Sequence, residues 1–244
     1  MRAQIRVYIC RISWQAHIVA AAKRGACCSQ RNQCLVSRQE RRVVVSLDVA
    51  ASEFRTDEGY RLALESRTLE SGALIELLGR WIDDYAVVSV EDPLAEDDVR
   101  GMRDFTAAHG ERVQVVGDDY LVTNADLVAA AAREGACNCV LIKPNQAGTV
   151  SAALDAFDAA RAAGWGAIVS ARSGESEDVS VAHLASGLGA AQLKVGSFAR
   201  SERMAKWNEC LRVQDELGVD AFVGGRPLAN TWWAARRPSE DQVQ

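Results

Sequence analysis

Six positions along the chain combine charged or hydroxyl side chains with a short apolar run directly before them. They are Asp48, Glu91, Asp118, Lys143, the pair Arg172-Ser173, and Lys194. An amphipathic stretch follows each one. In parallel α/β barrels the chemistry lies at the carboxyl ends of the strands. We therefore interpret these positions as strand ends that contribute to one active site.

Three of the candidates are carboxylates at strand ends, namely Asp48, Glu91 and Asp118. Mg²⁺ prefers hard oxygen ligands, and separate strands allow three carboxylates to converge on one ion. A single acid after a strand is more often a solvated loop residue or a helix cap, but three at regular spacing favour a metal site. We assign the neighbouring Asp92 and Asp119 a supporting or structural role.

Lys143 ends an apolar strand, an unusual place for a residue type that is rarely buried. Partial burial, with Lys194 nearby, would favour the neutral amine, and a neutral amine can act as a general base. The alternative is an ion pair between Lys143 and one of the carboxylates.

Arg172 and Ser173 together offer a fork of N–H donors and a hydroxyl, a combination suited to a phosphate. The alternative is a structural salt bridge from Arg172 to Glu175 or Glu177. A metal, a lysine base and an anion clamp indicate proton abstraction next to a carboxylate, a reaction whose enediolate a metal stabilises. On residue types alone, this reaction is one option among several. His183 is expected to pack or to face solvent rather than to catalyse.

The apolar runs and amphipathic stretches predict alternating strands and helices. Strands are expected at 43–47, 87–90, 113–116, 139–142, 167–170 and 192–195, and helices at 74–82, 97–108, 125–133, 149–163, 179–186 and 202–217. The five intervals from Asp48 to Lys194 span 146 residues, a mean of about 29 per interval, which is close to the roughly 31 residues per unit of a (β/α)8 barrel. The sequence predicts an α/β TIM barrel with about six βα units visible, and a loop excursion over 50–70.

Composition narrows the class of protein. Hydrophobic residues make up 48% and charged residues 25% of the 244 residues, as in ordinary globular proteins. No apolar run approaches the roughly 20 residues of a membrane span, and a net charge of −5 argues against nucleic acid as a partner. We expect a cytoplasmic protein whose Cys137, Cys139 and Cys210 are reduced and buried.

The first 42 residues differ in composition from the rest. Residues 1–43 contain nine Lys or Arg and one acid, and four of the seven cysteines. This stretch could be a transit peptide, a cationic arm, or a poorly ordered leader from an incorrect start site or reading frame. Its lack of periodicity favours the third interpretation. We therefore divide the chain into 1–42, a barrel over 43–220, and a C-terminal tail over 221–244.

At these motifs the chain resembles the enolase (phosphopyruvate hydratase) family over about residues 43–220. The resemblance is carried by LDVAASEF (47–54), SVEDP (89–93), VGDD (116–119), VTN (122–124), ACNC (136–139), LIKPNQAG (141–148), RSGESED (172–178) and RSERMAKWN (200–208). It implies a Mg²⁺-dependent lyase of glycolysis that removes the C2 proton of 2-phosphoglycerate and eliminates water to give phosphoenolpyruvate. Such enzymes are typically dimers, which makes a homodimer possible here.

The resemblance also implies a role for each candidate residue. Asp48, Glu91 and Asp118 would hold the Mg²⁺ that contacts the substrate carboxylate. Lys143 would be the base, Lys194 would contact the substrate carboxylate, and Arg172 with Ser173 would bind the phosphate.

Three departures from the family pattern leave alternatives open. Ala171 stands where enolases carry a histidine, Pro144 stands where an aliphatic residue is frequent, and no segment of the chain matches the family's N-terminal domain. One alternative is an enzyme of phosphonate antibiotic biosynthesis, of the type that makes carboxyphosphonoenolpyruvate. The other is a truncated, inactive protein that keeps the fold.

Overall fold

The computed structural model describes residues 6–11, 43–85, 87–190, 192–221, 223 and 226–231. The chain forms two compact units. Unit 1 comprises Met1–Val115 with Leu228–Gln244, and unit 2 comprises Val116–Pro227. The predictions made for the rest of residues 1–42 and for the tail after Thr231 lie outside the described residues.

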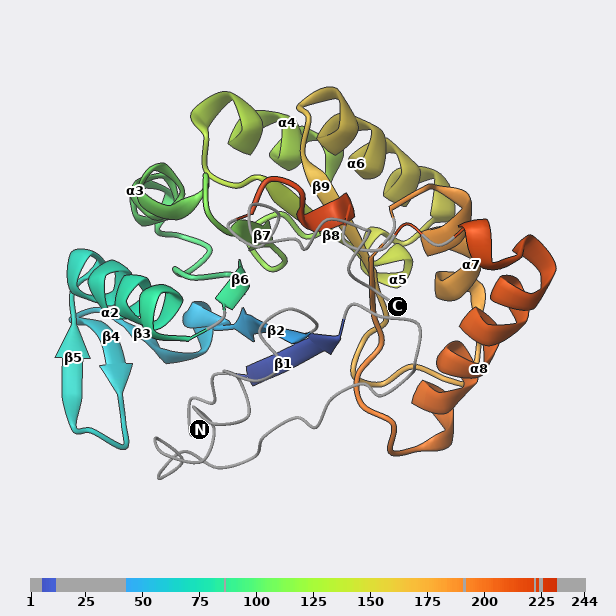
Figure 1. The fold of residues 1–244 in the computed structure, drawn as a ribbon. Coiled ribbons are helices and arrows are strands. Elements are labelled where there is room, and N and C mark those ends of the chain that lie inside the picture. The colour runs from blue at the N-terminus through green and yellow to red at the C-terminus, as the bar shows by residue number, and fades with distance from the viewer. Residues whose placement is uncertain are drawn as a thin grey trace, which may run out of the picture. The chain divides into compact units, whose positions relative to one another are not determined.

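Strands and helices alternate along both units (Figure 1). The strands of this repeat are β2 (Val43–Asp48), β6 (Val87–Glu91), β7 (Gln114–Gly117), β8 (Cys139–Ile142), β9 (Gly166–Ser170) and β10 (Leu193–Lys194). The helices are α2 (Ser71–Asp84), α3 (Val99–His109), α4 (Ala125–Glu134), α5 (Pro144–Ala147), α6 (Val150–Ala162), α7 (Ser180–Gly187) and α8 (Ser201–Leu217). The predicted α/β class and the six βα units are confirmed.

The valine-rich strands explain why this repeat forms. Every residue of β6, β7 and β8 is buried, as expected for parallel strands covered on both faces. In unit 2, Val116, Cys139 and Leu141 form one apolar cluster, against which Ile168 packs. In unit 1, Val44 and Val88 pack with Leu228, which lies in the short helix η3 (Arg226–Leu228).

In unit 1, β2 pairs in parallel with β6, and β1 (Arg6–Arg11) runs antiparallel to β2 on its other side. The β2–β6 register shifts between Val45 and Ser46, and this irregularity brings Asp48 level with Glu91. The strand ends that carry the candidate carboxylates are therefore set by the register of this pair.

The stretch over residues 50–70 is not the loop that its polarity predicts. It contains a short helix, η1 (Ala51–Phe54), and an antiparallel sheet of β3 (Arg55–Thr56), β4 (Gly59–Leu62) and β5 (Arg67–Leu69). Tyr60 and Leu69 are the buried large side chains of this sheet, and the ring of Tyr60 lies edge-on to Phe54 with centroids 5.9 Å apart. Strands this short, with so few buried side chains, do not produce a recognisable alternation of apolar and polar residues.

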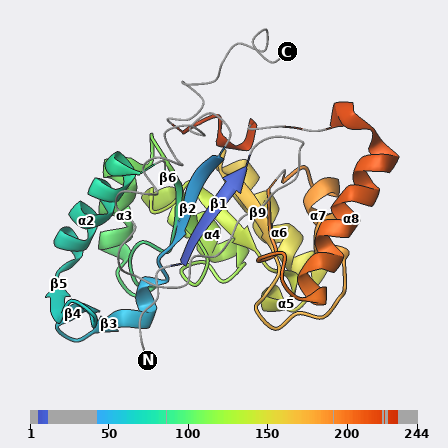
Figure 2. The same cartoon turned by 60° about the horizontal axis from the view of Figure 1, so that its bottom comes forward.

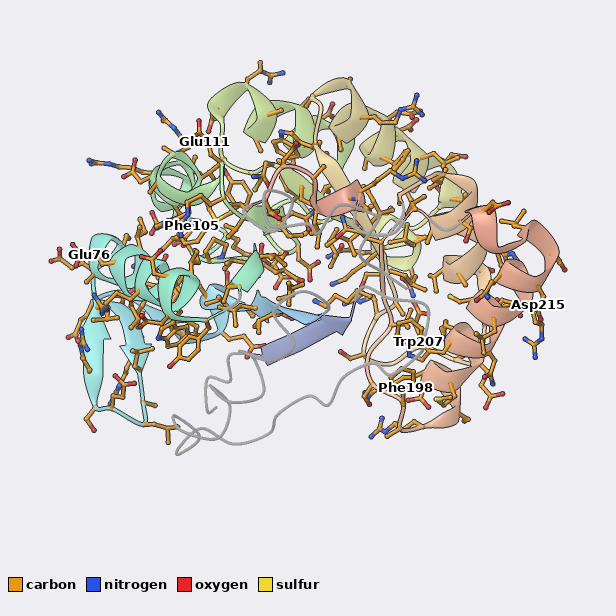
Figure 3. All side chains as sticks on the ribbon, viewed as in Figure 1. Glu76, Phe105, Glu111, Phe198, Trp207 and Asp215 are labelled. Atoms are coloured by element: carbon orange, nitrogen blue, oxygen red, sulfur yellow. The ribbon has the colours of Figure 1, made fainter. Side chains whose placement is uncertain are left out.

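In unit 2, β7, β8, β9 and β10 pair in parallel in that order. Helices α7 and α8 lie side by side (Figure 2). Phe198, in the loop after β10, stacks on Trp207 of α8 with ring centroids 5.4 Å apart (Figure 3). This contact attaches the loop that follows Lys194 to α8.

Two of the cysteines with described side chains behave as predicted, and a third differs. Cys137 and Cys139 are buried, whereas Cys210 on α8 is partly exposed. Burial still raises the pKa of the Cys210 thiol to about 11, so this thiol is a poor nucleophile near neutral pH. No helix in the described part of the chain is long and apolar enough to cross a membrane.

Candidate active site

Asp48 and Glu91 lie level with each other on neighbouring parallel strands of unit 1. Their Cα atoms are register partners, and each residue is only 4% exposed. The backbone pairing continues beyond them, since the N–H of Val49 donates to the carbonyl of Glu91 at 3.0 Å. Buried carboxylates on adjacent strands need a cation or hydrogen-bond donors to offset their charge. Their hard oxygen atoms fit a divalent cation such as Mg²⁺.

Asp92 turns the chain directly after β6. Its φ of 40° lies in the left-handed region, which Asp and Asn adopt more readily than most residues. Its carbonyl accepts a hydrogen bond from the N–H of Ala51 at 3.2 Å, which connects the loops after β2 and β6. These contacts give Asp92 a structural role in unit 1.

In unit 2, Asp118 and Lys143 form an ion pair between the ends of β7 and β8. The Lys143 Nζ lies 2.7 Å from Oδ1 and 2.5 Å from Oδ2 of Asp118. Their side chains are 11% and 13% exposed, respectively, so water screens the pair only weakly. The alternative raised for Lys143, an ion pair with a strand-end carboxylate, is therefore present in this structure. The pair also places the proposed base directly against a proposed metal ligand.

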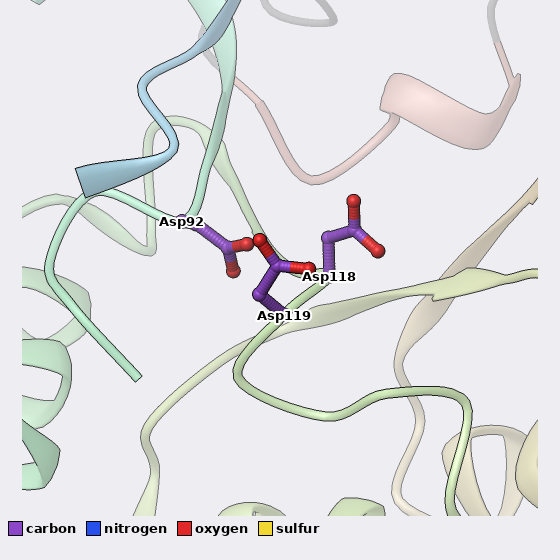
Figure 4. Close-up of side chains that lie close together, drawn as sticks. All are labelled: Asp92, Asp118 and Asp119. Atoms are coloured by element: carbon purple, nitrogen blue, oxygen red, sulfur yellow. The ribbon is translucent and has the colours of Figure 1, made fainter. Parts of the chain in front are cut away.

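Gly117 allows the chain to turn tightly into Asp118. A Cβ at this position would lie 2.5 Å from Cδ1 of Leu121, which is closer than real Cβ contacts. Leu121 folds back under the turn, and its N–H donates to the carbonyl of Asp118 at 3.1 Å. Figure 4 shows the side chains of Asp118 and Asp119 on this turn. Asp118 is buried, whereas Asp119 is exposed.

Thr123 joins this turn to the segment that carries Lys143. The N–H of Lys143 donates to the Thr123 hydroxyl at 3.0 Å. The hydroxyl in turn lies 3.2 Å from the carbonyl of Leu141 and 3.1 Å from Oε1 of Gln146, either of which can accept its hydrogen. Asn124, the next residue, caps α4 through its side chain. Thr123 instead fixes the backbone of Lys143.

Arg172 and Ser173 are exposed on the loop after β9. The N–H of Arg172 donates to Oε1 of Glu175 at 3.1 Å, and the same oxygen accepts from Nδ2 of Asn145 at 2.9 Å. In the described part of the chain, no carboxylate lies within ion-pairing distance of the Arg172 guanidinium. Glu175 therefore contacts Arg172 through the backbone N–H, and the alternative of a structural salt bridge from Arg172 to Glu175 or Glu177 is not present among the described residues.

Lys194 ends β10 beside the start of the same loop. Its Cα pairs with that of Ser170, and its carbonyl accepts a hydrogen bond from the N–H of Ala171 at 3.0 Å. The side chain of Lys194 is half-buried. Ala171 occupies the position immediately before Arg172, and its methyl group offers no hydrogen bond.

His183 lies on α7 and is removed from this chemistry. Its Nε2 is 2.8 Å from Oε1 of Glu209 on α8, and its side chain is 55% exposed. The contact connects the two helices, in agreement with the expectation that His183 packs or faces solvent.

Three residues that support these loops were not identified as functional candidates from the sequence. They are Thr123, Asn145 and Lys206. All three lie inside the enolase-like segments, at 122–124, 141–148 and 200–208. Only Asn145 had a signal in the sequence, since it stands two residues after Lys143.

Comparison with known proteins identifies the family. The model of the enolase C-terminal TIM barrel domain matches residues 36–231. The chain is also 46% identical over 183 residues to Enolase 1 of Methylococcus capsulatus, an alignment that covers 75% of this chain and 44% of that protein. The chain belongs to the enolase family through this C-terminal barrel domain, and the predicted enolase-type TIM barrel is confirmed. It spans less than half the length of this curated relative.

Proposed function

We propose that this chain carries out enolase-type proton abstraction. The substrate would be 2-phosphoglycerate or a close analogue, and the product after loss of water would be phosphoenolpyruvate. The family match over most of the chain carries this proposal. The position of Lys143 directly after strand β8 supports it, because the chemistry of parallel α/β barrels lies at the carboxyl ends of the strands.

Each candidate residue has a role in this proposal. Asp48, Glu91 and Asp118 would hold Mg²⁺, which would supply positive charge to the substrate carboxylate. Lys143 would be the base that takes the C2 proton on Nζ.

Substrate binding would depend on other residues of unit 2. Lys194 would contact the substrate carboxylate through its ammonium group. Arg172 and Ser173 would donate hydrogen bonds to the phosphate oxygens, and the exposure of both residues leaves them accessible to a ligand.

The test is deuterium exchange at C2 of 2-phosphoglycerate in D₂O, followed by NMR with the purified chain and Mg²⁺. Exchange together with phosphoenolpyruvate formation would establish the full reaction. Exchange alone would establish proton abstraction without the dehydration step. The absence of exchange in folded protein would contradict the proposal and favour an inactive protein that keeps the fold.

Ala171 favours a second candidate function. The family's histidine at this position is replaced by a methyl group, a change that suits a substrate with a different group near the phosphate. A phosphonate substrate, as in the synthesis of carboxyphosphonoenolpyruvate, is one such case. Turnover of a phosphonate analogue in preference to 2-phosphoglycerate would support this function, and equal or weaker turnover would exclude it.

The proposed function also implies a cellular compartment and an oligomeric state. We expect the protein to act in the cytoplasm, where glycolytic substrates occur, and to form a homodimer as enolases typically do. Light scattering on the purified chain would test the oligomeric state, and a monomeric mass at all concentrations would contradict the dimer.

A further inference from the structure

Glu175 receives hydrogen bonds from two segments that carry proposed functional residues. Its Oε1 accepts the N–H of Arg172 at 3.1 Å and Nδ2 of Asn145 at 2.9 Å. Asn145 lies on α5, two residues after Lys143. One carboxylate oxygen therefore connects the backbone of the proposed anion clamp to the helix that follows the proposed base.

The second oxygen of Glu175 faces a buried cation. Lys206 on α8 is 1% exposed, and its Nζ lies 3.6 Å from Oε2 of Glu175. The same Nζ donates to the carbonyl of Glu202 at 2.8 Å and to the carbonyl of Ser176. Lys206 thereby holds the residue after Glu175 as well as Glu175 itself. The side chain of Glu175 is 12% exposed, so the contact is shielded from solvent.

The positive charge of Lys206 explains how the acid Glu175 can lie beside residues that are proposed to bind an anion. A carboxylate three residues from Arg172 would repel a phosphate if its charge were uncompensated. Lys206 supplies the compensating positive charge from the buried side, while Arg172 and Ser173 remain exposed. The arrangement orders the loop and leaves its donors available.

We propose that Glu175 is a positioning residue for anion binding. It sets the backbone of Arg172 and Ser173 relative to the segment of Lys143, with Asn145 and the buried Lys206 as its anchors. This role rests on the proposed function for its ligand, a phosphorylated carboxylic acid, but the ordering of the loop is independent of any ligand.

The first arm of the test measures hydrogen exchange of the Arg172 and Ser173 amides by NMR, without ligand. Glu175→Ala should accelerate exchange of the Arg172 amide about tenfold, because its acceptor is removed. Glu175→Gln keeps an acceptor oxygen and should stay within about threefold of the unmodified chain. Glu177→Ala is the matched control, since it removes the same charge from an exposed position on the same loop and should leave the amide unchanged.

The second arm measures the Kd of 2-phosphoglycerate with Mg²⁺ present. Glu175→Ala should raise the Kd about tenfold, and Asn145→Ala, which removes one anchor from an exposed position, about threefold. Glu175→Gln and Glu177→Ala should remain within about twofold. A purely electrostatic role predicts the reverse pattern, in which all variants lacking the negative charge bind more tightly.

The two arms separate failure of this inference from failure of the proposed function. An unmodified chain that does not bind 2-phosphoglycerate contradicts the proposed function, and the amide arm still decides whether Glu175 positions the loop. Unchanged amide exchange in both Glu175→Ala and Asn145→Ala overturns the inference. Faster exchange in Glu175→Ala with an unchanged Kd also overturns it, because loop order would then not determine anion binding.

Discussion

Two carboxylates, Asp98 in unit 1 and Glu175 in unit 2, each hold several segments together, but they differ in what surrounds them. Asp98 accepts from the Tyr60 hydroxyl at 2.8 Å, from Ser71 Oγ at 2.5 Å and from the N–H of Gly101 at 2.9 Å. These donors come from β4, α2 and α3, and none is a candidate functional residue. The Asp98 network thus joins elements of the fold.

Glu175 instead accepts hydrogen bonds from the backbone N–H of Arg172, in the proposed anion clamp, and from Asn145, two residues after the proposed base. Its second oxygen faces the buried Lys206. Its neighbours Arg172 and Ser173 remain exposed. Hydrogen-bonding capacity alone therefore does not distinguish a carboxylate that supports a site from one that supports the fold. The distinction depends on whether the partners of the carboxylate lie next to candidate functional residues. Variants of the Asp98 network should therefore change the free energy of unfolding, and variants of the Glu175 network should change ligand binding.

The largest effect on stability is expected for Asp98→Ala. This variant removes the cap of α3 and leaves the Tyr60 and Ser71 hydroxyls without their shared acceptor. The free energy of unfolding should fall by about 3 kcal/mol, measured by urea denaturation. Asp97→Ala, at an exposed neighbouring position, should change it by less than about 0.5 kcal/mol. Equal effects of the two variants would contradict a stabilising role of the Asp98 network.

Tyr60→Phe should have the next largest effect. The hydroxyl donates to Asp98 and accepts from the buried N–H of Ala95 at 3.0 Å, so its removal leaves that N–H unpaired. The expected loss of unfolding free energy is about 2 kcal/mol. Tyr85→Phe, at an exposed position, serves as the control. A Tyr60→Phe chain as stable as the control would show that this network contributes little.

Asp118→Asn tests the proposed metal site, which the Asp98 network should not affect. Loss of one anionic oxygen ligand should weaken Mg²⁺ binding about tenfold, or about 1.4 kcal/mol, as measured by calorimetry. Asp98→Ala should leave the Mg²⁺ affinity of the folded protein within about twofold. Equal Mg²⁺ affinity in Asp118→Asn and the unmodified chain would remove Asp118 from the proposed ligands.

The smallest effect is a pH dependence of stability that arises from Asp98. Partial burial would raise the pKa of this carboxyl, but hydrogen bonds from Ser71, Tyr60 and the Gly101 N–H outweigh burial and hold the pKa below its usual value. A depressed folded-state pKa stabilises the protein above the ordinary pKa of about 4, and this contribution is lost as the pH falls through the folded-state value. The stability advantage over Asp98→Asn should therefore shrink below about pH 4. An advantage that stays constant into strong acid would contradict this account.

The strand ends could be predicted from the sequence because the strands are continuous apolar runs interrupted by charged residues. The runs before Glu91 and Lys143 are buried on both faces, so their composition alone identifies them. The sheet of β3, β4 and β5 could not be predicted in this way, since its short strands bury only isolated residues such as Tyr60.

The contacts within the site were harder to predict than its members. The sequence allowed an ion pair for Lys143, but its partner, Asp118, depends on the pairing of β7 with β8. It also gave Glu175 as a possible partner of Arg172, although the contact uses the backbone N–H. The burial of Lys206 has no sequence signal, because lysine is rarely buried and its neighbours do not reveal which carbonyls it reaches.

The measurement that tests the central claim most directly is the C2 exchange rate of 2-phosphoglycerate in the unmodified chain and in Lys143→Ala. Arg133→Ala, at an exposed position on α4, is the control for loss of a positive charge. We predict exchange in the unmodified chain and the control, and a rate at least about 100-fold lower in Lys143→Ala. An exchange rate in Lys143→Ala equal to that of the control would show that Lys143 is not the base.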